Sequence, residues 1–175
     1  MAYSAFGRSG QRRSHGGGRG SDSAEKEFDQ KTIELARVSR VMAGGKRMRF
    51  RACIVIGDRK GRVGAGLAKG ADVSLAISKA VSAAKKHLLS VPLFEETIPH
   101  EIRVKFKAAE VLMKPAPRGT GIIAGGAVRS VLDLAGVPNV VAKILGSRNK
   151  INNVQATIQA LASLRRRAPR PEAKS

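Results

Sequence analysis

Residues 47–56 read Arg-Met-Arg-Phe-Arg-Ala-Cys-Ile-Val-Ile, and this stretch decides the fold of the first half of the chain. Its side chains alternate in character, as they do in a β-strand, where successive residues point to opposite faces of a sheet. One face collects Met48, Phe50, Ala52, Ile54 and Ile56, whereas the other carries Arg49 and Arg51. We therefore predict a strand with one face against an apolar core and a basic face toward solvent.

Turn signals lie on both sides of this strand. Before it, Ala43-Gly-Gly-Lys46 predicts a hairpin turn, and residues 31–41 predict a first strand whose apolar phase shifts once, as at a β-bulge. After it, Gly57-Asp-Arg-Lys-Gly61 predicts a second turn, followed by a glycine-rich third strand that runs to about Lys69. The pattern indicates three antiparallel strands joined by tight turns.

A helix is predicted after the third strand. Asp72 is the expected N-cap, and the helix is expected to run to about Leu89, because apolar residues recur every three or four positions. These residues are Val73, Ala76, Ile77, Ala80, Val81, Ala84 and Leu88. Pro92 ends the unit, so one helix would cover one face of the sheet in a two-layer β-β-β-α domain over residues 29–93.

A second domain is predicted over residues 94–164. Alternating segments predict strands, and apolar residues at helical spacing predict helices, the first of which ends at Gly136. The expected elements are strands at 101–106, 110–113 and 137–145 and helices at about 127–136 and 152–164. The order is β-β-α-β-α, so the fold class is α+β with two small two-layer domains.

The two ends of the chain differ from these domains in composition. Residues 1–20 contain six glycines, four arginines and no acid. Such a segment cannot bury enough apolar surface to offset the entropy of ordering, so residues 1–28 are expected to be a disordered basic arm. Residues 165–175 begin with three arginines and contain two prolines, which predicts a second basic tail.

The charge balance indicates the class of partner. Lys and Arg number 33 against 13 Asp and Glu, so the formal net charge is +20. A small folded protein tolerates such self-repulsion best when a polyanion neutralises it, and nucleic acid is the usual polyanion because each phosphate contact releases a counterion. A membrane surface fits less well, since no amphipathic segment pairs a basic face with bulky apolar residues.

Cysteine usage and hydropathy exclude other classes. Cys53 is the single cysteine, so no intrachain disulfide and no cysteine-based zinc site is expected, and its place in a strand predicts a small buried side chain. The first 25 residues lack the apolar region of a signal peptide, and no apolar run approaches the roughly 18 residues that span a bilayer. These features predict a cytoplasmic protein with no membrane partner.

No catalytic or cofactor site is predicted. Two glycine-rich stretches, Gly64-Ala-Gly66 with Gly70 and Gly119-Thr-Gly121 with Gly125, each place the third glycine one residue too late for a dinucleotide motif. Neither ends in the Gly-Lys-Ser/Thr of a phosphate loop, and the three histidines lack metal-ligand spacing. We therefore expect no enzyme activity, no cofactor, no metal and no small-molecule substrate.

The basic residues, by contrast, form a candidate site. Ten of them lie between residues 37 and 69, with Asp58 as the only acid among them. They are Arg37, Arg40, Lys46, Arg47, Arg49, Arg51, Arg59, Lys60, Arg62 and Lys69. We predict that they form one continuous patch that contacts RNA phosphates and 2′-hydroxyl groups, because five Phe and one Tyr are too few for a base-stacking surface.

A second candidate RNA contact lies in the second domain. Arg118, Gly119 and Thr120 precede the helix that is expected to begin near Ala127. Free N–H groups at a helix N-terminus favour an anion, so a backbone phosphate is the expected ligand.

Two blocks of sequence are informative as motifs. The first comprises Gly45-Lys46, Phe50, Ala52, Val55-Ile-Gly-Asp58, Gly61, Val63-Gly64, Gly66, Asp72-Val73 and Ala76-Ile77. The second comprises Gly119-Thr-Gly-Ile-Ile-Ala-Gly-Gly-Ala-Val-Arg129, followed by Gly146-Ser147, Asn149 and Asn152. In this order the two blocks resemble the bacterial-type ribosomal protein S-five family of the small subunit. The resemblance covers about residues 30–164 and is specific, because two long motifs occur in the right order.

The resemblance implies a fold and a set of partners. The N-terminal domain would be similar to a double-stranded-RNA-binding domain, and the C-terminal domain would contain a left-handed βαβ crossover, against the usual right-handed rule. A structural role in the small ribosomal subunit is implied, with binding to 16S ribosomal RNA where head meets body and contact with ribosomal proteins S-four and S-eight. Roles in subunit assembly and translational fidelity are implied as well. Gly121 and Arg129 fall where the family's fidelity-related residues face S-four, and Arg37 through Arg47 falls on its spectinomycin-associated hairpin.

Two other functions fit parts of the pattern. A free-standing RNA chaperone or double-stranded-RNA-binding factor would use the first domain, but it has no need of the second block. A small kinase of the fold related to the second domain would need a phosphate loop and a catalytic base, which the sequence lacks.

Overall fold

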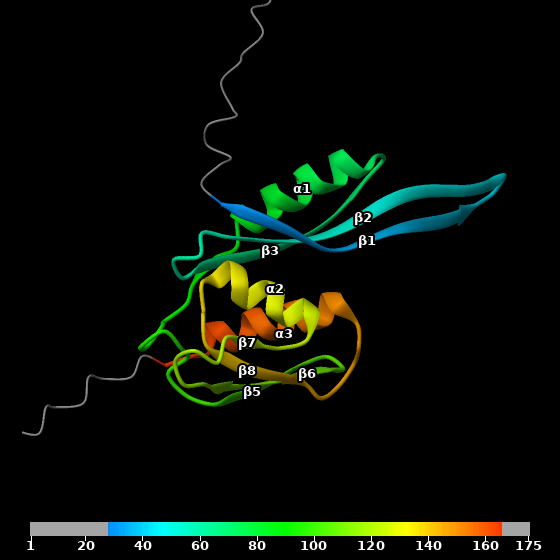
Figure 1. The fold of residues 1–175 in the computed structure, drawn as a ribbon. Helices are drawn as coiled ribbons and strands as arrows, with labels where there is room; N and C mark the ends of the chain where they lie inside the picture. Colours follow the sequence, from blue (N-terminus) through cyan, green and yellow to red (C-terminus); the bar gives the residue numbers. More distant parts are fainter. Residues whose placement is uncertain (1–27, 166–175) are drawn as a thin grey trace, which may run out of the picture.

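A computed structural model describes residues 28–165, so the predicted basic ends at 1–28 and 165–175 lie almost entirely outside the described residues. The described elements are β1 (Asp29–Met42), β2 (Gly45–Gly57), β3 (Arg62–Gly70), α1 (Val73–Lys85), β4 (Leu88–Ser90), β5 (Ile102–Phe106), β6 (Ala109–Pro115), β7 (Ile122–Ile123), α2 (Gly126–Ala135), β8 (Val140–Ile144) and α3 (Lys150–Ala162). They form four layers, which from top to bottom in Figure 1 are α1, the sheet of β1 to β4, the pair α2 and α3, and the sheet of β5 to β8.

The first sheet has the strand order β1-β2-β3-β4, and all its pairs are antiparallel. The predicted β-β-β-α order is present, but the helix is shorter than expected. It ends at Lys85 instead of near Leu89, and residues 88–90 form β4 against the start of β3. Leu88 and Leu89 continue the helical spacing in sequence, and a three-residue strand is too short to show an alternation of its own.

Small residues bring α1 close to the first sheet. Ala76, Ala80 and Ala84 of the helix are fully buried against the apolar face of β2. A Cβ added at Gly66 of β3 would lie 2.0 Å from the carbonyl oxygen of Ala80, and one at Gly70 would lie 2.6 Å from a backbone nitrogen of the helix. The glycines of the third strand therefore serve close packing of helix on sheet, which accounts for the first of the two glycine-rich stretches.

β1 and β2 form a hairpin that extends beyond the rest of the first sheet. Their antiparallel pairing continues from a bulge at Ile33 to the Ala43-Gly44 turn. β3 accompanies β2 only as far as Phe50, which pairs with Gly70. Residues 37–49 therefore project as a two-stranded ribbon, seen at the right of Figure 1, and we call them the hairpin arm.

The second sheet has the order β5-β6-β8-β7, with β7 parallel to β8 and the other pairs antiparallel. β7 contains only two residues and has no signal in the sequence pattern. Because α2 connects β7 to β8, these three elements form the βαβ crossover that the resemblance implies, and its left-handedness stays a prediction. Gly136 follows α2 in the left-handed conformation, with φ of +76°, as expected for a helix that ends there.

The helices α2 and α3 pack against the face of the first sheet opposite α1. Val55 and Val63 of that sheet are fully buried in the same apolar cluster as Val128 of α2. The basic face predicted for β2 is therefore solvent-exposed only in its outer half, at Arg49. Farther along the same face Cys53 and Val55 are buried. One apolar core spans both halves of the molecule.

The β2–β3 turn closes this contact at the C-terminal end of α2. The backbone N–H groups of Arg59 and Gly61 donate to the carbonyl oxygens of Leu134 and Ala135, at 3.1 and 3.0 Å. Carbonyl groups in the last turn of a helix have no partner within the helix, so these bonds satisfy two of them. A Cβ at Gly136 would lie 2.1 Å from the carbonyl oxygen of Arg59, which explains why glycine occupies this point of contact.

Candidate nucleic-acid interface

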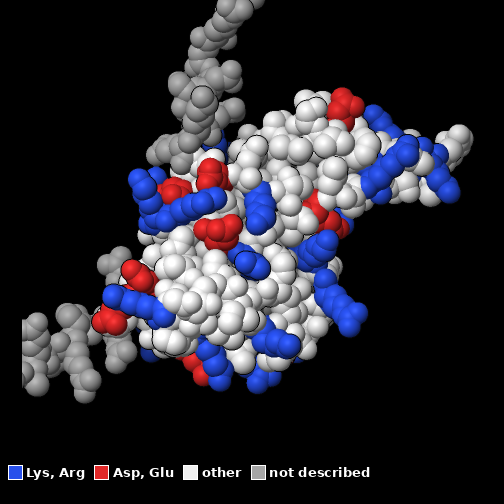
Figure 2. All heavy atoms as spheres, in the orientation of Figure 1, with Lys and Arg blue, Asp and Glu red and all other residues white. Residues whose placement is uncertain are grey.

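Six of the ten predicted basic residues lie on the hairpin arm or next to it. They are Arg37, Arg40, Lys46, Arg47, Arg49 and, near the end of β3, Lys69. All six are exposed, and within residues 28–165 none of them forms an ion pair with an acidic side chain. Figure 2 shows Lys and Arg along this arm, with acidic side chains only toward its base. The arm therefore carries positive charge that the described part of the protein does not compensate.

The hairpin register brings several of these cations together on one face. Arg40 lies directly opposite Arg47 in the pairing of β1 with β2. Arg47 and Arg49 share a face because side chains alternate along a strand, and with Arg40 and Lys69 they line a hollow of about 290 Å³. Like charges on directly opposite residues destabilise a hairpin, so an anion bound in this hollow would relieve the repulsion.

The predicted continuous patch extends to Arg51, which lies directly opposite Lys69 at the base of the arm, but it does not extend to the basic residues of the β2–β3 turn. Three of the remaining basic residues form ion pairs: Arg51 with Glu34 at 3.1 Å, Arg59 with Asp29 at 2.9 Å and Arg62 with Asp58 at 2.6 Å. The β2–β3 turn contains Arg59 and Lys60, and Arg62 begins β3 directly after it, at the far end of β2 from the arm's tip. At 3.3 Å per residue the two ends of this strand are roughly 40 Å apart. An RNA contact at the turn stays a prediction that is separate from the arm.

Asp58 organises the β2–β3 turn. Its carboxylate accepts hydrogen bonds from the backbone N–H groups of Lys60 and Arg62, at 2.8 and 2.9 Å, and from the Arg62 side chain at 2.6 Å. Burial alone would raise the pKa of Asp58, but the hydrogen bonds from Arg62 and Lys60 outweigh it and hold the pKa below its ordinary value of 3.8. The charged carboxylate thus holds the turn in the shape that docks on α2.

The predicted RNA-binding loop of the second domain is anchored by Asn139, which the sequence did not single out. Asn139 is only 5% exposed, and its Oδ1 accepts hydrogen bonds from the backbone N–H groups of Gly119 and Gly121, both at 3.1 Å. Its backbone carbonyl accepts a third bond from the Thr97 hydroxyl at 2.6 Å. A single asparagine between a helix and a strand carries no periodicity, motif or charge signal, so the fold alone identifies it as the anchor of this loop.

The other predicted residues of the second domain lie at the surface. Arg118 is exposed and lies 3.7 Å from Glu96, an exposed pair that contributes little to stability. The Thr120 hydroxyl donates to a backbone carbonyl of its own turn, at 2.8 Å. Gly121 has φ of +74°, a left-handed conformation that favours glycine. Arg129 is exposed on α2, and the described residues give it no acidic partner.

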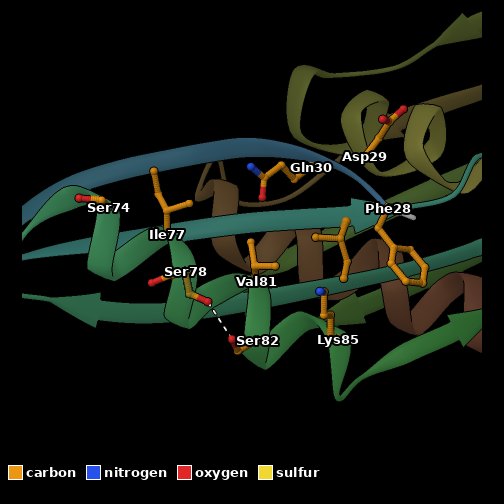
Figure 3. Close-up of a pocket in the computed structure, with 10 residues that line it drawn as sticks. Phe28, Asp29, Gln30, Ser74, Ile77, Ser78, Val81, Ser82 and Lys85 are labelled. Atoms are coloured by element: carbon orange, nitrogen blue, oxygen red, sulfur yellow. Dashed lines mark hydrogen bonds between the residues drawn. The ribbon is translucent and has the colours of Figure 1, made fainter. Parts of the chain in front are cut away.

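A further hollow, of about 730 Å³, lies between the start of β1 and α1 (Figure 3). Apolar side chains and serine hydroxyls alternate along its α1 wall, and the Ser82 hydroxyl donates to the Ser78 carbonyl at 3.0 Å. Lys85 and Asp29 are the charged side chains in its lining. The lining therefore offers neither a group of cations for a phosphate chain nor a set of metal ligands.

Two other findings concern the kinds of site that the described residues contain. Between residues 28 and 165 no helix combines the length and the apolar character that a membrane crossing needs. Over the same range, His, Cys, Asp and Glu side chains nowhere gather in threes as metal ligands would.

The fold and this surface define a class of protein: small, strongly basic and two-domained, with a projecting hairpin suited to a polyanion. The family follows from comparison with known proteins. Family models described as "Ribosomal protein S5, N-terminal domain" and "Ribosomal protein S5, C-terminal domain" match residues 28–92 and 104–172. The small ribosomal subunit protein uS5 of Thermus thermophilus is 49% identical over 144 residues, which cover 82% of this chain and 89% of that relative. Sequences from two strains of the same organism match equally well.

The chain therefore belongs to the ribosomal protein S-five family, as the two sequence blocks indicated. Both domain matches lie in the order that the sequence predicts, and the α+β fold with two sheets agrees with them.

Proposed function

We propose that this protein is a structural component of the small ribosomal subunit, in the cytoplasm, and that it binds 16S ribosomal RNA chiefly through the hairpin arm. Membership of the family supports the place in the small subunit. The observation that carries the RNA contact is the group of six exposed, uncompensated cations on and beside the arm. Arg40 and Arg47 oppose each other across the hairpin, and an anion bound between or over them would relieve their repulsion.

The shape of the arm fits folded RNA better than single strands. The ribbon is narrow, and its tip carries Arg and Lys beside the exposed apolar side chains of Val41, Met42 and Met48. No aromatic ring lies between residues 37 and 49. Such a surface reads phosphates and groove shape, whereas single-strand binding depends on stacking of bases on aromatic rings. The arm would therefore enter a junction of RNA helices, in keeping with the implied site between head and body.

We further propose roles in subunit assembly and translational fidelity, with ribosomal proteins S-four and S-eight as neighbours. Gly121 and Arg129 are the residues assigned to the S-four contact. Their surroundings support this assignment, because Arg129 is exposed on α2 and a Cβ at Gly121 would meet no described atom within 4 Å. The alternative, a free-standing RNA chaperone, is disfavoured because the second domain also matches the ribosomal family.

The experiment that tests the place in the ribosome is sedimentation of a tagged copy of the full chain. We expect it to sediment with the small subunit on a sucrose gradient and to remain there in high salt, where weakly held RNA-binding factors dissociate. A tagged chain that stays at the top of the gradient would contradict the ribosomal role and would favour the chaperone.

The fidelity role gives a separate prediction. Gly121→Arg and Arg129→Ser should disturb a protein–protein contact more than the fold, although Gly121→Arg also adds the backbone strain of a side chain at φ of +74°. Ribosomes that contain either variant should assemble but misread more codons. A stop-codon readthrough assay measures this, and Arg129→Lys, which keeps the charge, is the matched control. Readthrough at the unmodified level with both variants incorporated would remove these residues from the contact.

A further inference from the structure

A hollow of about 520 Å³ in the second domain has a lining that includes none of the residues assigned above to RNA or protein contact. It is lined by Gly126, Ala127, Ile144, Gly146, Arg148, Lys150 and Asn153. No acidic side chain takes part in the lining. Arg148 and Lys150 are exposed, and neither forms an ion pair with an acid in the described range.

Two helices begin at this hollow. α2 starts at Gly126 and α3 at Lys150, and both residues are part of the lining. The N-cap of α2 is Gly125, which has no side chain to accept from the first N–H groups, and the first turn of neither helix contains an acid. At α3 the Asn149 side chain accepts a hydrogen bond from the Ile151 N–H at 3.1 Å, so one donor there is already paired. Helix N-termini carry partial positive charge and N–H donors without a partner inside the helix, so the two together attract an anion.

Asn153 supplies an independent observation. It is 2% exposed, and its Oδ1 is the buried side-chain oxygen in the described residues that has no hydrogen-bond partner. A buried polar atom without a partner destabilises a protein, so most such atoms have one. Asn153 lines the hollow, so a molecule bound there would lie beside this unpaired oxygen.

We propose that this hollow is a binding site for one ribose-phosphate unit of an RNA backbone. The phosphate would lie at the starts of α2 and α3, between Arg148 and Lys150, and the Asn153 Oδ1 would accept a hydrogen bond from the adjacent ribose 2′-hydroxyl. A phosphate oxygen or a carboxylate cannot donate to Oδ1, whereas a 2′-hydroxyl can, and it also distinguishes RNA from DNA. The inference rests on the proposed RNA-binding function and adds a site to it in the other domain.

The location of the hollow agrees with a shared RNA partner. In Figure 1, α2 and α3 both begin at the right of the lower domain, on the side toward which the hairpin arm projects. One folded RNA could therefore contact the basic face of the arm and this hollow together.

Gly126 allows the site to be blocked without disturbing the fold. A Cβ at Gly126 would meet no described atom within 4 Å, and this glycine does not have a left-handed φ. Gly126→Glu places a negative charge where the phosphate would lie and, at a helix N-terminus, favours the helix itself. Gly126→Gln is the matched control, with the same size and no charge. Asn153→Ala removes the unpaired oxygen and should leave the unfolding temperature unchanged or higher.

The measurement is equilibrium binding of the full chain to a synthetic RNA duplex of about 16 base pairs and to its deoxy counterpart, over a series of salt concentrations. We expect Gly126→Glu to weaken RNA binding about tenfold, as for loss of one charge-assisted contact, and to lower the log–log salt slope by about 0.9. Gly126→Gln should change the affinity for RNA and the salt slope much less. Asn153→Ala should weaken binding to RNA severalfold and leave binding to DNA unchanged.

The double variant Lys46→Ala/Arg47→Ala separates this inference from the proposed function. Weaker binding by that variant with normal binding by Gly126→Glu and Asn153→Ala would overturn the hollow as an RNA site and leave the function of the arm intact. If the hollow holds a carboxylate of a partner protein instead of RNA, Gly126→Glu and Asn153→Ala would likewise bind RNA normally. Normal RNA binding by all of the variants would overturn the proposed RNA contact of the arm as well.

Discussion

Cys53 is the only cysteine of the chain, and its environment makes it inert. It is 3% exposed in β2, and burial, together with the nearby carboxylate of Glu34, raises the pKa of its thiol to about 11 against the lowering effect of Arg51. The thiolate is the reactive form of cysteine, so almost none of it is present at neutral pH. The sequence-based interpretation of Cys53 as a small buried side chain is confirmed.

This pKa predicts how the stability of the protein depends on alkaline pH. The unfolded thiol loses its proton near its ordinary pKa of 9.0, whereas the folded thiol keeps it to about 11, so the unfolded state is favoured as pH rises through this window. The loss of stability should approach roughly 3 kcal/mol, at about 1.4 kcal/mol per unit. Denaturant unfolding at pH 8 and at pH 11 measures it, with Cys53→Ala as the control for other titrating groups. Identical losses in both proteins would show that Cys53 contributes nothing.

Gly136 gives a second prediction at the scale of one residue. Its φ of +76° disfavours any side chain, and a Cβ there would lie 2.1 Å from the Arg59 carbonyl oxygen. Gly136→Ala should therefore lower the free energy of unfolding by about 2–4 kcal/mol. Gly126→Ala is the matched control, because it lies at the other end of α2 in open space and should change stability by no more than about 0.5 kcal/mol. Equal stability of the two variants would contradict the close docking of the β2–β3 turn on α2.

At the scale of single residues, sequence reasoning succeeds where a pattern is local. The exposed cations of the hairpin arm follow from strand alternation and from the Ala43-Gly-Gly-Lys46 turn. The ion-pair partners of Arg51 and Arg59 cannot be predicted in this way. Glu34 and Asp29 lie on a neighbouring strand and contact these arginines only through the hairpin register. The role of Asn139 and the unpaired oxygen of Asn153 are likewise products of tertiary packing.

Among the elements, the hairpin arm is the one most separate from the core. Its residues from Ala43 to Arg49 are all exposed, and β3 does not reach them. Lys46→Ala/Arg47→Ala should therefore change the free energy of unfolding by no more than about 0.5 kcal/mol. Contact with 16S RNA at the head–body junction should weaken, and the resemblance suggests that spectinomycin sensitivity would fall too. Chemical probing of mutant subunits measures the RNA contact directly.

A matched control for the arm variant is Lys105→Ala/Lys143→Ala, which removes the same charge from exposed positions on β5 and β8. If both double variants reduce RNA protection equally, net charge and not the arm determines binding. If the arm variant leaves the protection of 16S RNA at the head–body junction and the drug sensitivity unchanged, the hairpin is a solvent-exposed turn that does not contact RNA.

The elements that sequence reasoning missed are the short ones. β4 has three residues and β7 has two, so neither contains enough positions for an alternation to be recognised. Each exists because a neighbouring strand offers an unpaired edge, β3 for β4 and β8 for β7. Longer elements were predicted well, since β2 alone presents six or more alternating positions and α2 ends at a glycine in the conformation that such a helix end favours.

The two domains of the whole molecule are less independent than their sequences indicate. Each has its own sheet, and the sequence predicts two separate two-layer units. The structure joins them, because Val55 and Val63 of the first sheet are buried against α2, which is itself buried on most sides. Alternation along β2 identifies two faces, but it cannot tell whether the second face meets water or another domain.

This shared core predicts that the two domains unfold together. Leu132 of α2 is fully buried in the cluster that contains residues of both halves, and Leu132→Ala should destabilise the protein by about 2–5 kcal/mol. If the halves form one cooperative unit, calorimetry should give a single transition at a lower temperature. Amide exchange in β2 should then accelerate by the same factor as in β6, although Leu132 belongs to the second domain. Two separate transitions, or protection of β2 that is unaffected by the substitution, would show that the domains are joined without being coupled. The outcome matters for RNA binding. A single rigid unit would hold the hairpin arm at a fixed distance from the hollow at the starts of α2 and α3. One folded RNA can then contact both without reordering the protein.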